Sequence, residues 1–159
     1  VPAGMIVNRI DTVQMARDLA AAKRAGVDFI VACLHWGNEY ERQANTAQRT
    51  LALFLQRHGV DVVVGSHPHV VQPWEADSSR VVLYSLGNLV SNQRRRYTDG
   101  GLVAEVEAVR HPGGRMTYRT PASSVWCALP GDPPRPPAAA RTMTPTPASP
   151  DFLAHAQAR

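Results

Sequence analysis

The sequence is poor in lysine, in cysteine and in long apolar runs. Sixteen of its seventeen basic residues are arginines, spread along the chain, and the net charge is +4. No run approaches the roughly 18 apolar residues of a membrane-spanning helix, and the first residues lack the charged-then-apolar layout of a secretory signal. The two cysteines, Cys33 and Cys127, lack zinc-ribbon spacing and leave the redox compartment open. Cys33 lies within an apolar run, so we expect it to be buried.

One basic run, Arg94-Arg95-Arg96, lies in a polar stretch. Two interpretations stay open for it: contact with phosphate or an anionic polymer, or a solvated loop. Aromatic residues do not alternate with the arginines as they do on nucleic-acid-binding surfaces. We therefore expect no nucleic-acid partner.

The length of 159 residues and the hydrophobic content of 44% suit one globular domain. Eight of the thirteen prolines lie between Pro130 and Pro150. The sequence therefore predicts a folded domain over residues 1–127 and a Pro-rich linker or disordered tail over residues 128–159.

Alternating helical and extended patterns predict an α/β fold. Asp11 or Thr12 can cap a first helix, which Gly26 ends. The further expected elements are a strand over 27–34, a loop over 35–45, a helix over 46–58, a strand over 60–64, a strand over 80–86 and an antiparallel hairpin over 101–125. The first two strands flank a helix, so we expect them to run parallel through a right-handed crossover.

Three histidines follow these two strands. His35 ends the first run, and His67 and His69 follow the second, where Gly65 and Ser66 are expected to break the strand. A single histidine at a strand end is more often structural. Three of them at the carboxyl edge of paired strands, where α/β sheets bind ligands, instead favour a metal site.

Pro68 separates His67 from His69. Proline disfavours the helical region for the residue before it, so we expect His67 to be extended. In an extended segment residues two apart point to the same side, so both imidazoles are expected to face one spot.

Three motifs in order resemble the CapA family of poly-γ-glutamate capsule biosynthesis proteins, which is similar to the calcineurin-like metallophosphatase superfamily. They are His-Trp-Gly-Asn-Glu-Tyr at 35–40, Gly-Ser-His-Pro-His-Val at 65–70 and Tyr-Ser-Leu-Gly-Asn at 84–88. The resemblance covers roughly residues 10–110. It implies a four-layer α/β/β/α sandwich with a two-metal site.

The resemblance implies metal-ligand roles for His35, His67 and His69. It places Glu39 and Asn88 near the site as candidate catalytic residues. Asn88 has three possible roles: donor to substrate, residue that positions a loop, or simple turn residue after Gly87. The implied cofactors are divalent ions, with Mn, Fe or Zn left open and two ions in the full-length protein.

The sequence departs from the family pattern in its N-terminal part. The aspartates of the first metal site and the bridging carboxylate of the superfamily have no counterpart, because Asp11 and Asp18 are explained by the first helix. The chain therefore resembles the C-terminal half of the catalytic domain, and we expect it to be inactive alone.

The resemblance implies a metal-dependent hydrolase of the metallophosphatase type in capsule polymer biosynthesis. The implied substrate is a phosphoester or an anionic polymer, and the implied partner is the envelope or capsule synthesis machinery. The alternative is a non-catalytic assembly component that retains the fold. The resemblance suggests the cell envelope or an extracytoplasmic location, whereas the residues themselves leave the compartment and the oligomeric state open.

Overall fold

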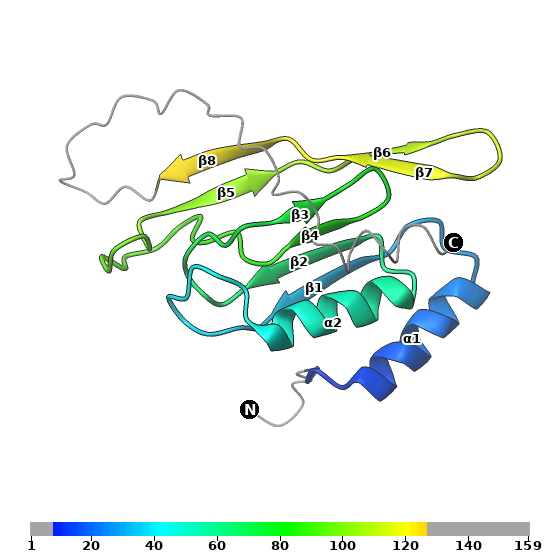
Figure 1. Cartoon of the computed structure of the whole chain (residues 1–159), viewed down its shortest axis with the longest axis horizontal. Coiled ribbons are helices and arrows are strands. Elements are labelled where there is room, and N and C mark those ends of the chain that lie inside the picture. The colour runs from blue at the N-terminus through cyan, green and yellow to red at the C-terminus, as the bar shows by residue number, and fades with distance from the viewer. Residues whose placement is uncertain (1–7, 127–159) are drawn as a thin grey trace.

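The computed structural model describes residues 8–126, which form a mixed α/β fold (Figure 1). The helices are α1 (Thr12–Arg24) and α2 (Thr46–Arg57). The strands are β1 (Val31–His35), β2 (Val62–Ser66), β3 (Glu75–Ala76), β4 (Val81–Leu83), β5 (Gly100–Ala104), β6 (Glu107–Arg110), β7 (Met116–Arg119) and β8 (Ala122–Trp126). The α/β fold class expected from the sequence is therefore confirmed.

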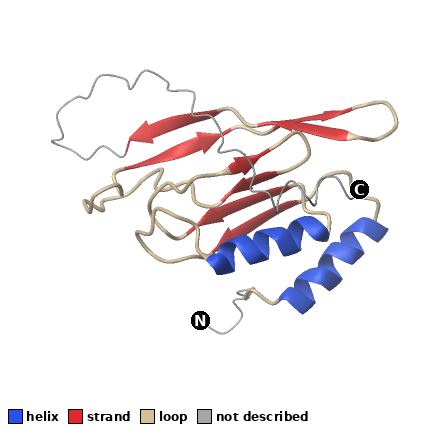
Figure 2. Cartoon of the chain, viewed as in Figure 1, coloured by secondary structure: helices blue, strands red, loops and turns tan. Residues whose placement is uncertain are grey.

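A four-stranded sheet of order β1-β2-β4-β3 forms the middle layer. Strands β1 and β2 are parallel, as expected. Strand β4 also runs parallel to β2, and β3 is antiparallel to β4. Both helices lie on one side of this sheet and the β5–β8 hairpin lies on the other (Figure 2). One apolar cluster joins helices to sheet through Leu55 and Val63, and a second joins sheet to hairpin through Leu83 and Leu102. The described residues thus form three layers, α/β/β, of the expected four.

Both helices begin at side-chain caps that the sequence encodes. The Asp11 carboxylate accepts hydrogen bonds from the Val13 and Gln14 amides, so Asp11 is the cap and not Thr12, the other residue considered from the sequence. Asn45 and Gln48 form a reciprocal capping box at the start of α2. None of the described helices is long and apolar enough to cross a membrane.

The expected end of the second strand is wrong, because β2 continues through Gly65 and Ser66. Gly65 pairs with Leu34 in the parallel register. A Cβ atom at Gly65 would collide with the Tyr84 carbonyl oxygen and the Trp36 indole nitrogen, which are hydrogen-bonded to each other at 2.9 Å. The glycine therefore permits close packing inside the strand instead of ending it.

Cys33 is exposed, so the expectation that it is buried is wrong. It lies on β1, an edge strand whose burial alternates, with Leu34 buried and Val31 and Cys33 exposed. An apolar run in the sequence does not reveal that its strand lies at an edge. Strand β1 also begins at Val31, four residues later than the expected strand.

The expected hairpin over 101–125 is present, but it is interrupted. Strand β5 pairs with β8 and β6 pairs with β7, both antiparallel and in one continuous register. At the interruption the Glu105 amide donates to the Pro121 carbonyl. Proline has no amide to return a ladder bond, which explains the break. Residues 1–7 and 127–159, including Cys127 and the expected Pro-rich tail, lie outside the described residues.

Replacement of Gly65 by alanine should destabilise the fold. The added methyl group must displace the Tyr84 backbone or break its bond to Trp36, and overpacking of this kind costs typically about 1–3 kcal/mol. We expect the free energy of unfolding, measured with urea, to fall by about 1 kcal/mol or more. Gly26→Ala is the control for backbone strain without overpacking, because it adds a methyl group to open space at a φ of +74°. A smaller loss for Gly65→Ala than for Gly26→Ala would contradict the packing argument.

Stability should decline at alkaline pH because of Tyr84. Burial and the charge of Glu75 raise the pKa of Tyr84 well above its usual value. Above about pH 10 an unfolded chain loses this phenol proton while the folded chain keeps it, so ionisation favours unfolding. Urea unfolding between about pH 8 and pH 11 should show the decline. Burial also raises the pKa of Tyr118, so Tyr84→Phe should flatten the decline only in part, and an unchanged slope would contradict the assignment.

Candidate functional site

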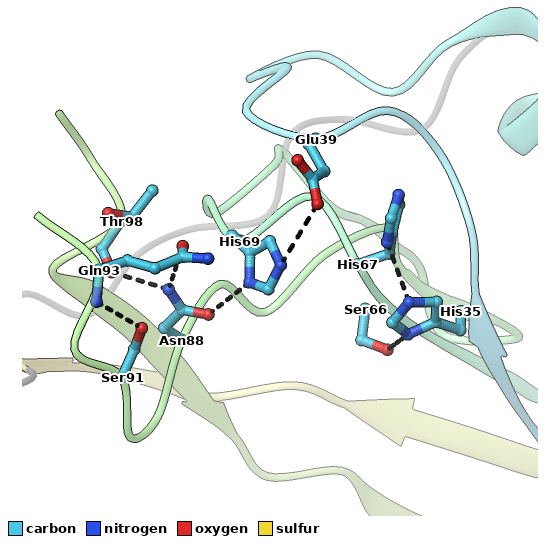
Figure 3. Close-up of polar contacts among 9 residues, drawn as sticks. All are labelled: His35, Glu39, Ser66, His67, His69, Asn88, Ser91, Gln93 and Thr98. Carbon is cyan, nitrogen blue, oxygen red and sulfur yellow. Dashed lines mark hydrogen bonds and ion pairs between the residues drawn. The ribbon is translucent and has the colours of Figure 1, made fainter. Parts of the chain in front are cut away.

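The carboxyl ends of the parallel strands bring the sequence-predicted site residues to one edge of the sheet (Figure 3). His35 ends β1 and pairs in register with Ser66, the last residue of β2. The loop with His67 and His69 follows at once, and Asn88 follows β4. The prediction that these histidines emerge at the same sheet edge is confirmed by the parallel pairing.

A chain of hydrogen bonds fixes His35 and His67. The Ser66 hydroxyl donates to the Leu34 carbonyl at 3.3 Å, and its oxygen lies 3.3 Å from His35 Nδ1. His35 Nε2 lies 2.9 Å from His67 Nδ1. With the hydroxyl proton directed to Leu34, this network assigns a proton to Nδ1 of both rings. His67 Nε2 is then left with a free lone pair.

A second hydrogen-bond chain fixes His69. Its Nδ1 lies 3.0 Å from Asn88 Oδ1. The Asn88 amide is oriented by donation of its Nδ2 to the Thr98 carbonyl at 2.8 Å, so Oδ1 must act as the acceptor for His69 Nδ1–H. In the neutral ring His69 Nε2 then carries the lone pair, and this atom faces Glu39 Oε1 at 4.0 Å. These contacts fit Asn88 as a residue that positions His69.

Buried glutamines hold the loop that carries Glu39, and the sequence reasoning missed them. Gln48 Nε2 donates to Gln72 Oε1 at 3.0 Å, and Gln72 Nε2 donates to the carbonyls of Glu41 and Gln43. Both glutamines are only 1–2% exposed. The spacing of Asn45 and Gln48 is a capping-box signal, but the sequence carries no signal for the role of Gln72.

The His-Pro-His segment is not extended, which corrects the expected conformation. The φ angles of His67 and His69 are +103° and +60°, in the left-handed region. The Tyr40 amide donates to the carbonyl of the buried Pro68 at 2.8 Å, so the neighbouring loop decides the backbone path. The His67 and His69 ring centroids are nevertheless only 6.3 Å apart.

The donor types at this edge suit a divalent metal, since imidazole and carboxylate together bind Zn, Mn and Fe. Asn88 holds the distal nitrogen of His69, as residues that orient metal ligands do. However, within residues 8–126 no group of three or more histidine, cysteine or acidic side chains is placed to hold one ion. Joint ligation by His35 and His67 would require their mutual hydrogen bond to break.

An apolar cavity of about 490 Å³ adjoins His35 and Ser66. Its apolar lining includes Cys33, Val64 and Leu86. The polar edge of the sheet therefore borders an apolar cleft on the side of the β5–β8 hairpin.

Removal of the Asn88 side chain should change the tautomer of His69. Without the Oδ1 acceptor no hydrogen bond stabilises the neutral tautomer that carries its proton on Nδ1. We expect the ¹⁵N chemical shifts of His69 in Asn88→Ala to report a mixture of tautomers at a pH where the ring is neutral. His58, whose Nδ1 lies 2.8 Å from the Phe54 carbonyl, is the internal control. An unchanged His69 tautomer would contradict a positioning role for Asn88.

Comparison with known proteins identifies relatives of this chain. Residues 3–93, which include all three motifs, match the model of the family described as bacterial capsule synthesis protein PGA_cap. The PGA biosynthesis protein CapA of Bacillus subtilis is 38% identical over 89 residues, which are 56% of this chain and 23% of that protein. The capsule biosynthesis protein CapA of Bacillus anthracis is 38% identical over 82 residues, 51% of this chain and 20% of that protein. The matched segment therefore spans about a quarter or less of these curated relatives. Because the family model covers more than half of the chain, the protein belongs to the PGA_cap family of bacterial capsule synthesis proteins.

Proposed function

We propose that the chain supplies the histidine part of a divalent-metal hydrolase site in a protein of capsule polymer biosynthesis. The names of the two Bacillus relatives support the biosynthetic role, and the polymer we propose is poly-γ-glutamate. The observation that carries the chemical part is the pair of hydrogen bonds made by Nδ1 of His67 and of His69, which in the neutral rings leaves each Nε2 atom with a lone pair at the sheet edge.

The proposed ligands are His35, His67 and His69. Asn88 keeps the proton of His69 on Nδ1, and Ser66 does the same for His35. Glu39, half exposed and 4.0 Å from His69, is placed to accept a proton or to orient a water molecule. Because Glu39 is half exposed, a substrate can reach its carboxylate from solvent.

The metal, once bound, would supply a Lewis acid for the scissile group and an activated water as the nucleophile. We propose two ions, of Mn, Fe or Zn, in the protein at its natural length, with further carboxylates from outside residues 8–126. The proposed substrate is a phosphoester or the anionic polymer itself, and the proposed partner is the capsule synthesis machinery at the cell envelope.

A second candidate function is a non-catalytic assembly component of the same machinery. The direct His35–His67 hydrogen bond and the lack of a three-residue metal group among the described residues favour it. In that case the histidines stabilise the loop, and the sheet edge serves as a scaffold.

Metal content and hydrolysis separate the two functions. In the protein at its natural length, His67→Ala should lower the content of bound metal, measured by elemental analysis. It should also lower the rate of hydrolysis of a generic phosphodiester by more than about 100-fold. Loss of a residue that merely orients a ligand already costs 10–100-fold. His58→Ala is the matched control, because His58 caps α2 and bonds to Phe54.

Equal metal content and rate in His67→Ala and the wild type would overturn the hydrolase assignment. A folded, metal-free wild type whose His67→Ala variant still supports capsule formation would establish the assembly function instead.

A further inference from the structure

Beside the histidines lies a group of three arginines and two tyrosines, which we call the arginine ledge: Tyr40, Arg42, Arg95, Arg96 and Tyr97. We propose that this ledge binds the carboxylates of an anionic polymer and directs the polymer to the histidine site. The proposal rests on the proposed function for the identity of the polymer, and on the following contacts for the binding site.

The ledge is built by cation–π contacts between two loops. The Arg95 guanidinium lies 4.0 Å from the centroid of the Tyr40 ring. Those of Arg42 and Arg96 lie 4.3 and 4.7 Å from the centroid of the Tyr97 ring. A guanidinium over a ring is ordered by its flat face, while its N–H edge stays free for a carboxylate.

The three guanidinium groups form no ion pair with any carboxylate of residues 8–126. All three side chains are exposed. Two positive charges close to the same Tyr97 ring repel each other, and a bound anion would relieve this repulsion. Clustered, ordered and unpaired guanidinium groups are the usual basis of carboxylate and phosphate recognition.

The ledge is physically continuous with the histidine site. The Tyr40 ring stacks on the His69 ring, with centroids 6.1 Å apart and planes inclined by 28°. The Arg95 carbonyl accepts hydrogen bonds from the amide and hydroxyl of the fully buried Thr98. The Thr98 carbonyl in turn accepts from Asn88, which holds His69.

Backbone strain marks the same place. Four non-glycine residues in the described part of the chain have positive φ angles: Tyr40 at +67°, His67 at +103°, His69 at +60° and Tyr97 at +71°. Two of them, His67 and His69, belong to the site, and the other two are the ledge tyrosines. Strained backbone persists where the surroundings enforce it, typically at functional sites. The positive φ angles therefore occur in both the ledge and the histidine loop, which supports a shared function for the two.

A polymer suits this ledge better than a small anion. Three guanidinium groups over two rings can engage successive carboxylates of one chain, and each further contact acts at a high effective concentration. Free glutamate offers only two carboxylates, and its ammonium group is repelled by the arginines, so it should bind more weakly than the oligomer.

The test measures binding of a fluorescein-labelled γ-linked glutamate oligomer to the protein at its natural length by fluorescence anisotropy. The variant R42Q/R95Q/R96Q should weaken binding by about tenfold or more, because charge-assisted hydrogen bonds are lost. Arg95→Lys, which keeps the charge but not the flat fork, should weaken it partially. Arg17→Gln, an exposed arginine on α1, is the control and should leave binding unchanged.

Three outcomes would overturn the proposal. One is unchanged oligomer binding by the triple variant with a native circular dichroism spectrum. Another is equal binding of the neutral methyl ester of the oligomer. The third is binding of inorganic phosphate or free glutamate as tight as that of the oligomer, which would assign the ledge to small anions.

Failure of the ledge is distinguishable from failure of the hydrolase assignment. If only the ledge proposal fails, the triple variant binds oligomer normally while His67→Ala still loses metal and activity. If only the hydrolase assignment fails, His67→Ala leaves metal content and rate unchanged while the triple variant still loses oligomer binding.

Discussion

The parallel register of β1 on β2 is the constraint on which the site depends. It places His35 opposite Ser66, so that His67, the next residue after Ser66, has its Nδ1 atom 2.9 Å from His35 Nε2. The register requires Gly65, because any larger residue would meet the Tyr84 carbonyl and the Trp36 indole. Packing inside the sheet and chemistry at its edge are therefore controlled by the same two strand ends.

Around this edge, buried polar contacts fix loops that would otherwise be free to move. Gln48 and Gln72 hold the loop that carries Glu39 and Tyr40, and the Tyr40 amide holds Pro68. Buried amides cost free energy unless they are hydrogen-bonded, so a satisfied network of this kind favours one arrangement. The strained φ angles of the histidines persist because these contacts enforce them.

Membership of the family indicates a role in capsule synthesis but does not assign a reaction to the site. The PGA_cap match covers residues 3–93 and ends before the β5–β8 hairpin, which packs over the sheet through Leu102. The imidazole lone pairs and Glu39 suit a metal hydrolase, whereas the His35–His67 hydrogen bond suits a structural role. The polymer-binding role that we propose for the arginine ledge is compatible with either function.

The sequence by itself determined the α/β class, both helices, the parallel β–α–β unit and the gathering of three histidines at one edge. These follow from local periodicity, capping chemistry and the handedness of crossovers, which a short stretch of sequence encodes. Only the tertiary structure decided that Gly65 continues a strand, that Cys33 is exposed at a sheet edge and that His67 is not extended. It alone also revealed the Gln48–Gln72 network and the stacking of Arg95 on Tyr40, because both join segments distant in the chain. Such contacts depend on which segments meet, and no local pattern records that.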